Sequence, residues 1–235
     1  MNFDDFADNY SDILNQGIRF SGESDEYFDL FKINCIKHWI LKEEDQLEIL
    51  DFGCGIGKLS TRIAEAFPNS TVYGYDVSTA SVDRASKKAP HLENLHYLNQ
   101  SFTGKKYDLV LAANVFHHIV PSERNETLLK LRQVLKSNGK LIVFEHNPLN
   151  PITRYVVQTC PLDSTAQLIR SSAFAKLAEK NGLFLLMKRY IVFFPKFLSW
   201  FRRFEFNLGL CPLGAQYFLL FSTDLRITSA REDIA

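Results

Sequence analysis

The chain has 235 residues, enough for one sizeable α/β domain with its own core. Hydrophobic residues make up 46% and charged residues 23%, as in an ordinary soluble globular protein. Lys and Arg together number 27, as do Asp and Glu, and this balance excludes the broad positive field that gathers nucleic acid.

The cysteines and the first residues bear on the compartment. The four cysteines, Cys35, Cys54, Cys160 and Cys211, lie far apart and form no C-x-x-C pair. We therefore expect reduced thiols in a cytoplasmic protein rather than a disulfide framework or a zinc site. The first ten residues carry three aspartates, which does not fit a secretory signal. No apolar run approaches the roughly 18 residues that a membrane span needs.

Residues 1–44 show no strand pattern, and we expect helices that cap one rim of the fold. From residue 47 onward, strand and helix patterns alternate. Strands are expected at 47–51, 71–76, 95–99, 107–113, 140–145, 184–194 and 216–222, and helices at 58–67, 79–88, 123–135 and 172–180. This alternation predicts an α/β fold with a doubly wound, mostly parallel sheet, whose ligands bind beyond the carboxyl ends of the strands.

Two connections, 147–171 and 195–214, are longer than the neighbouring strands require. Both leave from carboxyl ends of strands, so we expect both insertions to hang over the ligand-binding rim. Together with the N-terminal helices they would build an acceptor pocket. The alternative is that they only shield the sheet.

Residues 49–60 carry the most informative pattern. A buried strand ends at Asp51, and a helix begins at Lys58. Three glycines occupy alternate positions between them, Gly53, Gly55 and Gly57. Glycine permits positive φ and a close approach of the backbone to a ligand, and the start of a helix offers unpaired N–H groups to an anion. We therefore expect a ligand at this turn, where Cys54 contributes its backbone.

A second acid, Asp76, ends the following strand, where a carboxylate is placed to accept both ribose hydroxyls of an adenosine cofactor. The residues so far leave NAD and S-adenosylmethionine (SAM) open. The dinucleotide turn reads G-x-G-x-x-G, however, and its third glycine is replaced here by Lys58. The spacing therefore disfavours a nicotinamide cofactor.

The pattern Asp51-x-Gly53-x-Gly55-x-Gly57 resembles motif I of the class I SAM-dependent methyltransferases, and the resemblance covers about residues 45–146. It implies a Rossmann-like sheet of seven strands, the last of them antiparallel, in one methyltransferase domain over 1–235. It also implies that a set of residues binds SAM: Asp51, Gly53, Cys54, Gly55, Gly57, Asp76, Val77, Gln100, Ser101 and Asn114. The family usually has an acid near Gln100 to hold the adenine amino group, so this assignment departs from the family pattern.

The fourth strand leads into His117 and His118. Many small-molecule methyltransferases of this class carry such a pair; in some a histidine activates the acceptor, and in others it only packs. A histidine with a pKa of ~6.5 can act as a base at neutral pH, which an alcohol acceptor needs. Glu145 and His146 end the fifth strand and are expected to face the same cleft. Glu145 would orient a histidine, bind an acceptor hydroxyl, cap a helix or pair with an arginine.

The segment 193–206 is dense in aromatic residues beside Arg202 and Arg203. Three interpretations remain open. The segment buries its aromatic face against the sheet, forms a wall for an apolar or lipid-linked acceptor, or lies on a membrane surface as a peripheral contact.

Together these features predict a SAM-dependent methyltransferase for a small-molecule acceptor, with oxygen as the expected methyl acceptor on an apolar, glycan or secondary-metabolite intermediate. We expect no metal, since Asp108 and Asp163 read as isolated carboxylates. Nucleic acid is excluded as an acceptor. Asn147–Asn150 resembles the N-P-P-Y motif of amino-methyltransferases that act on nucleic acids, but that motif belongs after the fourth strand, and Asn147–Asn150 follows the fifth. The alternative function is a SAM- or S-adenosylhomocysteine-binding scaffold or regulatory subunit without activity. The oligomeric state does not follow from the sequence.

Overall fold

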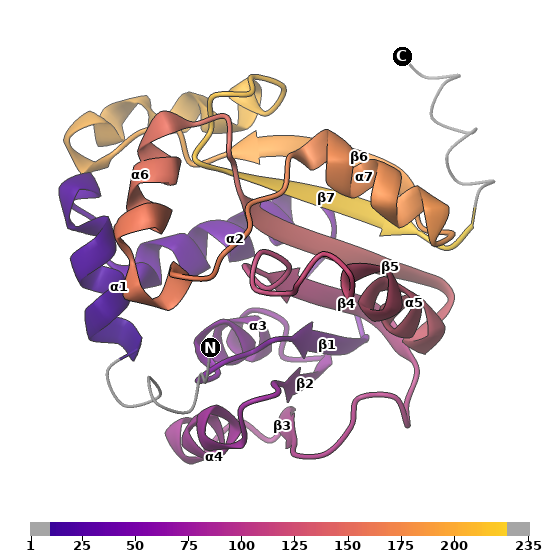
Figure 1. Ribbon diagram of the computed structural model, residues 1–235. Coiled ribbons are helices and arrows are strands. Elements are labelled where there is room, and N and C mark those ends of the chain that lie inside the picture. Colours follow the sequence, from indigo (N-terminus) through magenta and orange to yellow (C-terminus); the bar gives the residue numbers. More distant parts are fainter. Residues whose placement is uncertain (1–9, 225–235) are drawn as a thin grey trace.

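One sheet of seven strands, in the order β3-β2-β1-β4-β5-β7-β6, organises the computed structural model, which describes residues 10–224 (Figure 1). The strands are β1 (Glu48–Phe52), β2 (Thr71–Tyr75), β3 (Leu95–Leu98), β4 (Tyr107–Ala113), β5 (Leu135–His146), β6 (Phe184–Ile191) and β7 (Gln216–Ser222). Only β7 runs antiparallel to its neighbours, β5 and β6. The prediction of a doubly wound, mostly parallel seven-stranded sheet is confirmed.

Helices connect the strands and cover the rim. They are α1 (Tyr10–Ile18), α2 (Asp25–Trp39), α3 (Lys58–Ala66), α4 (Thr79–Lys88), α5 (Arg124–Val134), α6 (Pro151–Thr159) and α7 (Ser171–Lys180), with the 3-10 segments η2 (Arg19–Ser21), η3 (Pro161–Asp163) and η4 (Lys196–Leu208). The four helices predicted after residue 47 agree with α3, α4, α5 and α7 to within a residue or so at each end.

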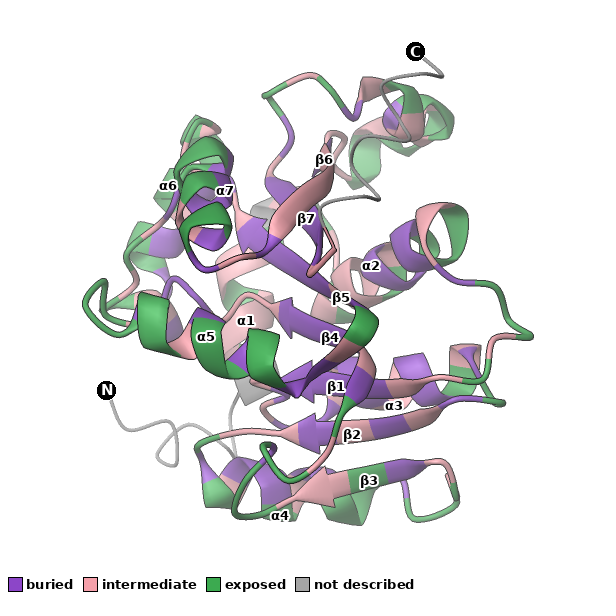
Figure 2. Cartoon of the chain, turned by 90° about the vertical axis from the view of Figure 1, so that its right-hand side faces the viewer, coloured by how far each residue is buried: buried purple, intermediate pink, exposed green. Residues whose placement is uncertain are grey.

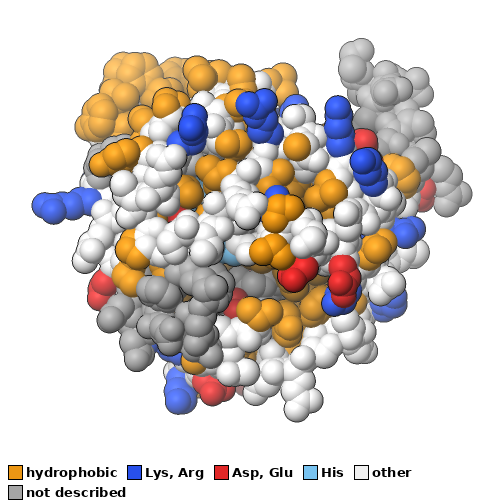
Figure 3. Space-filling view, in the orientation of Figure 1, with side chains coloured by type: hydrophobic (Ala, Val, Ile, Leu, Met, Phe, Trp, Pro, Cys, Tyr) orange, Lys and Arg blue, Asp and Glu red, His pale blue; other side chains and the backbone are white. Residues whose placement is uncertain are grey.

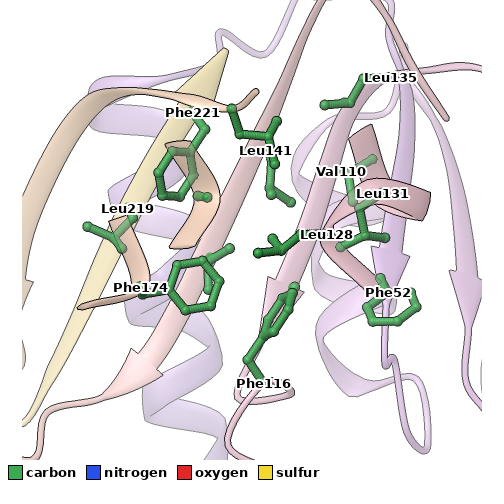
Figure 4. Close-up of a cluster of buried hydrophobic side chains, with 14 of the residues drawn as sticks. Phe52, Val110, Phe116, Leu128, Leu131, Leu135, Leu141, Phe174, Leu219 and Phe221 are labelled. Carbon is green, nitrogen blue, oxygen red and sulfur yellow. The ribbon is translucent and has the colours of Figure 1, made fainter. Parts of the chain in front are cut away.

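Each face of the sheet carries its own hydrophobic core. Successive side chains of a strand point to opposite faces, so Val110 and Ala112 of β4 join one core while Leu109 and Leu111 join the other. α5 and α7 cover the first core, and α2 and α3 cover the second, on the opposite side of the sheet (Figure 2). In the first core, Phe116 and Phe174 meet edge to face at 4.8 Å between side chains of β5, α5 and β7 (Figure 4).

β5 differs from its prediction at its start. Asn138-Gly139, a residue pair typical of turns, lies within the strand, which begins at Leu135 instead of residue 140. Tyr107 pairs with Leu135 and Leu109 pairs with Lys140, so β5 carries extra residues here as a bulge. The same residue types that favour a turn therefore make a local irregularity in a longer strand.

The insertion at 147–171 holds a helix that was not predicted. Asn150 caps α6 by accepting hydrogen bonds from the N–H groups of Ile152 (2.9 Å) and Thr153 (3.0 Å), and Pro151 occupies the first helical position. This pair of residues is a recognised helix start, so a local signal was present in the sequence.

No helix within residues 10–224 is both long and apolar enough to cross a membrane.

Candidate active site

The glycine turn between β1 and α3 depends on all three glycines. Gly53, Gly55 and Gly57 adopt φ values of +77°, +52° and +75°, a region that other residues rarely occupy. A Cβ on Gly53 would collide with Val115, and one on Gly57 would collide with Tyr97. A Cβ on Gly55 would meet nothing within 4 Å, so the middle of the turn faces open space. Packing thus fixes the two ends of the turn, and its middle is left accessible to a ligand.

Asp76 directly follows β2, and its side chain lies against this turn. Its Oδ2 accepts a hydrogen bond from the Gly55 N–H at 2.8 Å, and its Oδ1 accepts one from the Ser78 N–H at 2.9 Å. The parallel pairing of β1 with β2 brings the two strand ends together. The structure therefore places Asp76 beside Gly55, as the sequence pattern indicated.

Asp51 is buried at the start of the turn, with 2% of its surface exposed. Its Oδ2 accepts a hydrogen bond from the Ser60 hydroxyl at 2.6 Å. Burial raises the pKa of Asp51 to about 7, and the negative charges of Asp29 and Asp76 act in the same direction. The hydrogen bond from Ser60 lowers the pKa and only partly offsets the effect of burial. A cation bound nearby would favour the ionised carboxylate.

A cavity lies between the glycine turn, the carboxyl ends of β4 and β5, and the segments of the rim. Five of the residues predicted to bind SAM line it: Asp51, Gly53, Cys54, Gly55 and Asn114. The other five do not: Gly57, Asp76, Val77, Gln100 and Ser101. Val77, Gln100 and Ser101 are exposed at the surface, near the ends of β2 and β3.

Three polar atoms in the cavity wall are buried without a hydrogen-bond partner among the described residues. They are the Tyr27 hydroxyl oxygen, Asn114 Oδ1 and Gln216 Oε1. Buried polar groups in native proteins are nearly always paired, so such atoms gathered in one wall indicate a polar ligand. Asn114 also has a positive φ of 58°, unusual for a residue other than glycine.

α2 contributes charged groups that sequence reasoning did not find. Lys32 has only 4% of its side chain exposed, and its Nζ lies 3.3 Å from Asp29 Oδ1. Both residues line the cavity. An ion pair between Lys58 and Asp25 holds the start of α2 beside the start of α3. No local pattern in the sequence predicts that α2 docks on α3. Lys32 could therefore not be identified as a cavity residue from the sequence.

The predicted catalytic residues form a buried cluster behind the cavity. His117 Nδ1 lies 2.6 Å from Glu145 Oε2, and Glu145 Oε1 accepts a hydrogen bond from the Phe116 N–H at 2.7 Å. Asp163 Oδ1 lies 3.4 Å from His117 Nε2 and 3.5 Å from His118 Nε2. The structure thus brings His117, His118 and Glu145 together, with Asp163 added from the insertion.

None of these four side chains lines the cavity, whereas His146 does. Glu145 and His146 are neighbours on β5 and therefore point to opposite sides, so the expectation that they face one cleft is not met. The His146 ring centroid lies 5.1 Å from that of His117.

The cluster holds one charged and two neutral imidazoles at neutral pH. Burial acts to lower the pKa of His117, but Glu145 and Asp163 together outweigh it and raise the pKa to about 9. Burial, followed by the charge of His117, lowers the pKa of both His118 and His146 to about 4. His146 therefore presents a neutral ring to the cavity.

Asp163 is not the isolated carboxylate that the sequence suggested. Ligand atoms of His117, His118 and Asp163 lie within 4.8 Å of one another, which makes these residues a group that could hold a metal ion. A protonated His117 between Glu145 and Asp163 explains the same arrangement without one, because each carboxylate faces a nitrogen of the imidazolium.

The aromatic segment divides between core, cavity and surface. Phe206 stacks on His38 with ring centroids 4.5 Å apart, while Phe193 and Phe194 line the cavity. Phe197 and Trp200 are 76% and 62% exposed. Burial against the neighbouring elements therefore describes only part of this segment.

The chain matches a family model described as a methyltransferase domain over residues 50–141. It is 23% identical over 202 residues to an uncharacterized methyltransferase of Anoxybacillus flavithermus, a match that covers 85% of this chain and 88% of that protein. It is 36% identical over 100 residues to malonyl-[acyl-carrier protein] O-methyltransferase 1 of Ilyobacter polytropus. That match covers 41% of this chain and only 37% of the relative's length.

Among solved structures, the chain is similar to the magnesium protoporphyrin IX methyltransferase of Synechocystis PCC 6803, crystallised with bound SAH. The TM-score is 0.60 at 19% sequence identity, and the match covers 88% of this chain and 85% of that one. At this identity the likeness establishes the shared fold.

Proposed function

We propose that this chain is a class I SAM-dependent methyltransferase that transfers a methyl group to an oxygen atom of a small, largely apolar acceptor. One observation carries the proposal. A single cavity joins the glycine turn to an apolar compartment under the rim, and the neutral imidazole of His146 lies in its wall.

The residues around the glycine turn fit the methionine end of SAM. When bound, SAM supplies an electrophilic methyl group on a sulfonium centre. Asp51 would face the cofactor's positive charge, and the buried ammonium of Lys32 would pair with its carboxylate. Asn114 Oδ1, which lacks a partner among the described residues, would accept a hydrogen bond from its ammonium.

The nucleoside end of SAM would lie on the outer side of the turn. Asp76 would bind the ribose, since a carboxylate that accepts two backbone N–H groups has lone pairs left for hydroxyls. Val77, Gln100 and Ser101 would hold the adenine at the surface, consistent with their exposure.

Methyl transfer to a hydroxyl requires a proton acceptor. The ring of His146 lines the cavity, so a ring nitrogen can take the hydroxyl proton while the C–S bond breaks and the C–O bond forms. His117 or His118 was expected to be the base, but His146 is the histidine that reaches the cavity. We assign His117, held between Glu145 and Asp163, to positioning His146, whose ring centroid lies 5.1 Å away.

The acceptor compartment is mainly apolar. Its walls come from α1, α6 and the residues after β6, among them Ile18, Val156 and Phe193. Such a site excludes water from the reaction and leaves few polar groups to orient the acceptor. The name of the Ilyobacter relative, an O-methyltransferase, agrees with an oxygen acceptor.

The test is an acceptor screen with SAM and a panel of apolar hydroxy and carboxylic compounds, read by S-adenosylhomocysteine formation and by mass of the product. The proposal expects turnover with at least one oxygen acceptor and an O-methyl product. Methylation confined to amines would overturn the oxygen assignment. SAM binding without turnover on any class of acceptor would favour the non-catalytic scaffold.

A further inference from the structure

Exposed apolar side chains concentrate at one rim of the molecule. Of the twelve large hydrophobic side chains that are exposed in the described part of the chain, eight lie in two segments, 149–155 and 197–213. The first segment exposes Leu149, Ile152 and Tyr155. The second exposes Phe197, Trp200, Phe204, Leu210 and Leu213. We call these eight residues the apolar rim.

The two segments form one surface. The Asn150 side-chain N–H donates to the Leu213 carbonyl at 2.7 Å, and the Thr153 hydroxyl donates to the Ala215 carbonyl at 2.9 Å. Hydrophobic atoms gather at the upper left of the space-filling view (Figure 3), where Figure 1 places α6 and the segment between β6 and β7. The two segments of the apolar rim therefore lie side by side at one end of the molecule (Figure 3).

This surface continues into the cavity. Ile152 is 53% exposed and also lines the cavity. Phe194 and Pro195 line the cavity two or three residues before Phe197 on the apolar rim. Apolar side chains thus extend from the apolar rim into the cavity wall at Ile152 and at Phe194 and Pro195.

The charges beside the apolar rim are positive. Arg154, Lys196 and Arg203 are exposed, and Arg202 pairs with Glu23 at 2.8 Å. The only acid within 149–155 and 196–213 is Glu205, which is 2% exposed and accepts hydrogen bonds from the Phe193 and Phe194 N–H groups. The two segments of the apolar rim therefore carry exposed cationic side chains and no exposed acid among their exposed aromatics, in a chain with no net charge overall.

We propose that the apolar rim docks on an anionic lipid bilayer and that the methyl acceptor is an amphiphile drawn from that bilayer into the cavity. The identity of the acceptor rests on the proposed function, whereas the docking does not. Trp, Phe and Leu side chains favour the boundary between headgroups and acyl chains, and Lys and Arg attract anionic headgroups. Phe197 and Leu210, each 76% exposed, project from the surface, which suits insertion into a soft interface better than a fit to a rigid partner.

The fluorescence of Trp200 tests the docking directly. The chain has two tryptophans, and Trp39 packs edge to face on Phe206, 5.0 Å away. In a Trp39→Phe variant, Trp200 is the only tryptophan that contributes to the fluorescence. With vesicles of equimolar phosphatidylglycerol and phosphatidylcholine, its emission should shift to the blue and be quenched by brominated acyl chains. Emission unchanged by these vesicles would overturn the proposal.

Sedimentation with the same vesicles, without SAM or acceptor, compares matched variants. The double substitution Phe197→Ser and Trp200→Ser should lower the bound fraction at least tenfold. The control, Val120→Ser with Leu129→Ser, removes two exposed side chains elsewhere on the surface and should bind as the wild type does. Lys196→Glu with Arg203→Glu should weaken binding to the anionic vesicles and remove its salt dependence. Equal binding of all variants would overturn the docking.

Two further outcomes separate this proposal from the proposed function. Capture of an acidic carrier protein by the apolar rim, with no vesicle binding, would overturn docking on a bilayer and leave methyl transfer intact. Vesicle binding together with methylation of water-soluble acceptors only would overturn the assignment of a bilayer amphiphile as the acceptor.

Discussion

His117 and Glu145 form a buried ion pair, with Nδ1 of the imidazolium 2.6 Å from a carboxylate oxygen and both side chains at most 1% exposed. Glu145 lies on β5, and His117 lies in the loop after β4, so the pair fixes that loop to the neighbouring strand. It also places a positive charge behind His146, whose ring forms part of the cavity wall.

Glu145→Gln should lower the free energy of unfolding by about 3 kcal/mol, because it leaves a buried charge without its partner. The pKa of His117 is raised to about 9. The pair therefore makes its full contribution to the free energy of unfolding below pH ~6.5 and loses it as the pH rises through 9. The pKa of Glu145 is lowered, mainly by His117 and against burial, so the contribution is also lost in acid, below pH ~4.5. Urea unfolding from pH 4 to 10 would show wild-type stability falling above neutrality and a flatter profile for the variant. Glu126→Gln, at an exposed position, is the control; parallel pH profiles for wild type and Glu145→Gln would contradict the pair.

His146→Asn should lower kcat by a factor of about 10²–10⁴ if the ring takes the acceptor proton. The affinity for SAM should change little, since the assigned cofactor residues remain. Initial rates and calorimetry on the same preparation separate the two effects. His91→Asn, on the exposed surface, should behave as the wild type. An unchanged kcat for His146→Asn would remove this histidine from the reaction.

The affinity for SAM should rise with pH through neutrality. Because the pKa of Asp51 is raised to about 7, the carboxyl is largely protonated at pH 6, while a cationic ligand binds the ionised form. Calorimetry between pH 6 and 8 should show up to about tenfold tighter binding at the higher pH. Asp51→Asn should abolish this dependence. A wild-type affinity that is independent of pH would contradict the role of Asp51.

Metal removal should leave the enzyme unaffected. Each ring nitrogen of His117 faces a carboxylate, and these carboxylates raise its pKa to about 9, so a metal ion would have to displace a tightly held proton before it could bind. Dialysis against a chelator should change neither the melting temperature nor kcat. Stoichiometric zinc in the purified protein, lost together with stability on chelation, would instead assign a metal to His117, His118 and Asp163.

The glycine turn and the alternation of strands and helices could be predicted because their signals are local. Alternate glycines, a strand that ends on Asp51 and a helix start at Lys58 occur within a dozen residues. The alternation of side chains along a strand could also have been applied to β5. It places Glu145 and His146 on opposite faces of the sheet. The helix start at Asn150 and Pro151 was a further local signal.

The rest of the site depends on contacts between distant segments. Lys32 reaches the cavity because α2 docks on α3, and Asp163 reaches the histidines because the insertion after β5 folds back over the sheet. Neither position follows from a periodic pattern. The exposure of Phe197 and Trp200 likewise required the fold, since a segment rich in aromatics is as readily buried.

We propose that the glycine turn and Asp76 bind SAM. Calorimetry with SAM and S-adenosylhomocysteine on the wild type, Asp76→Ala and the exposed control Asp83→Ala tests it directly. We predict micromolar binding to the wild type and the control, and binding at least tenfold weaker to Asp76→Ala, about 1.4 kcal/mol. No binding of either ligand to the wild type, or equal binding to all three proteins, would contradict SAM binding at the glycine turn and Asp76.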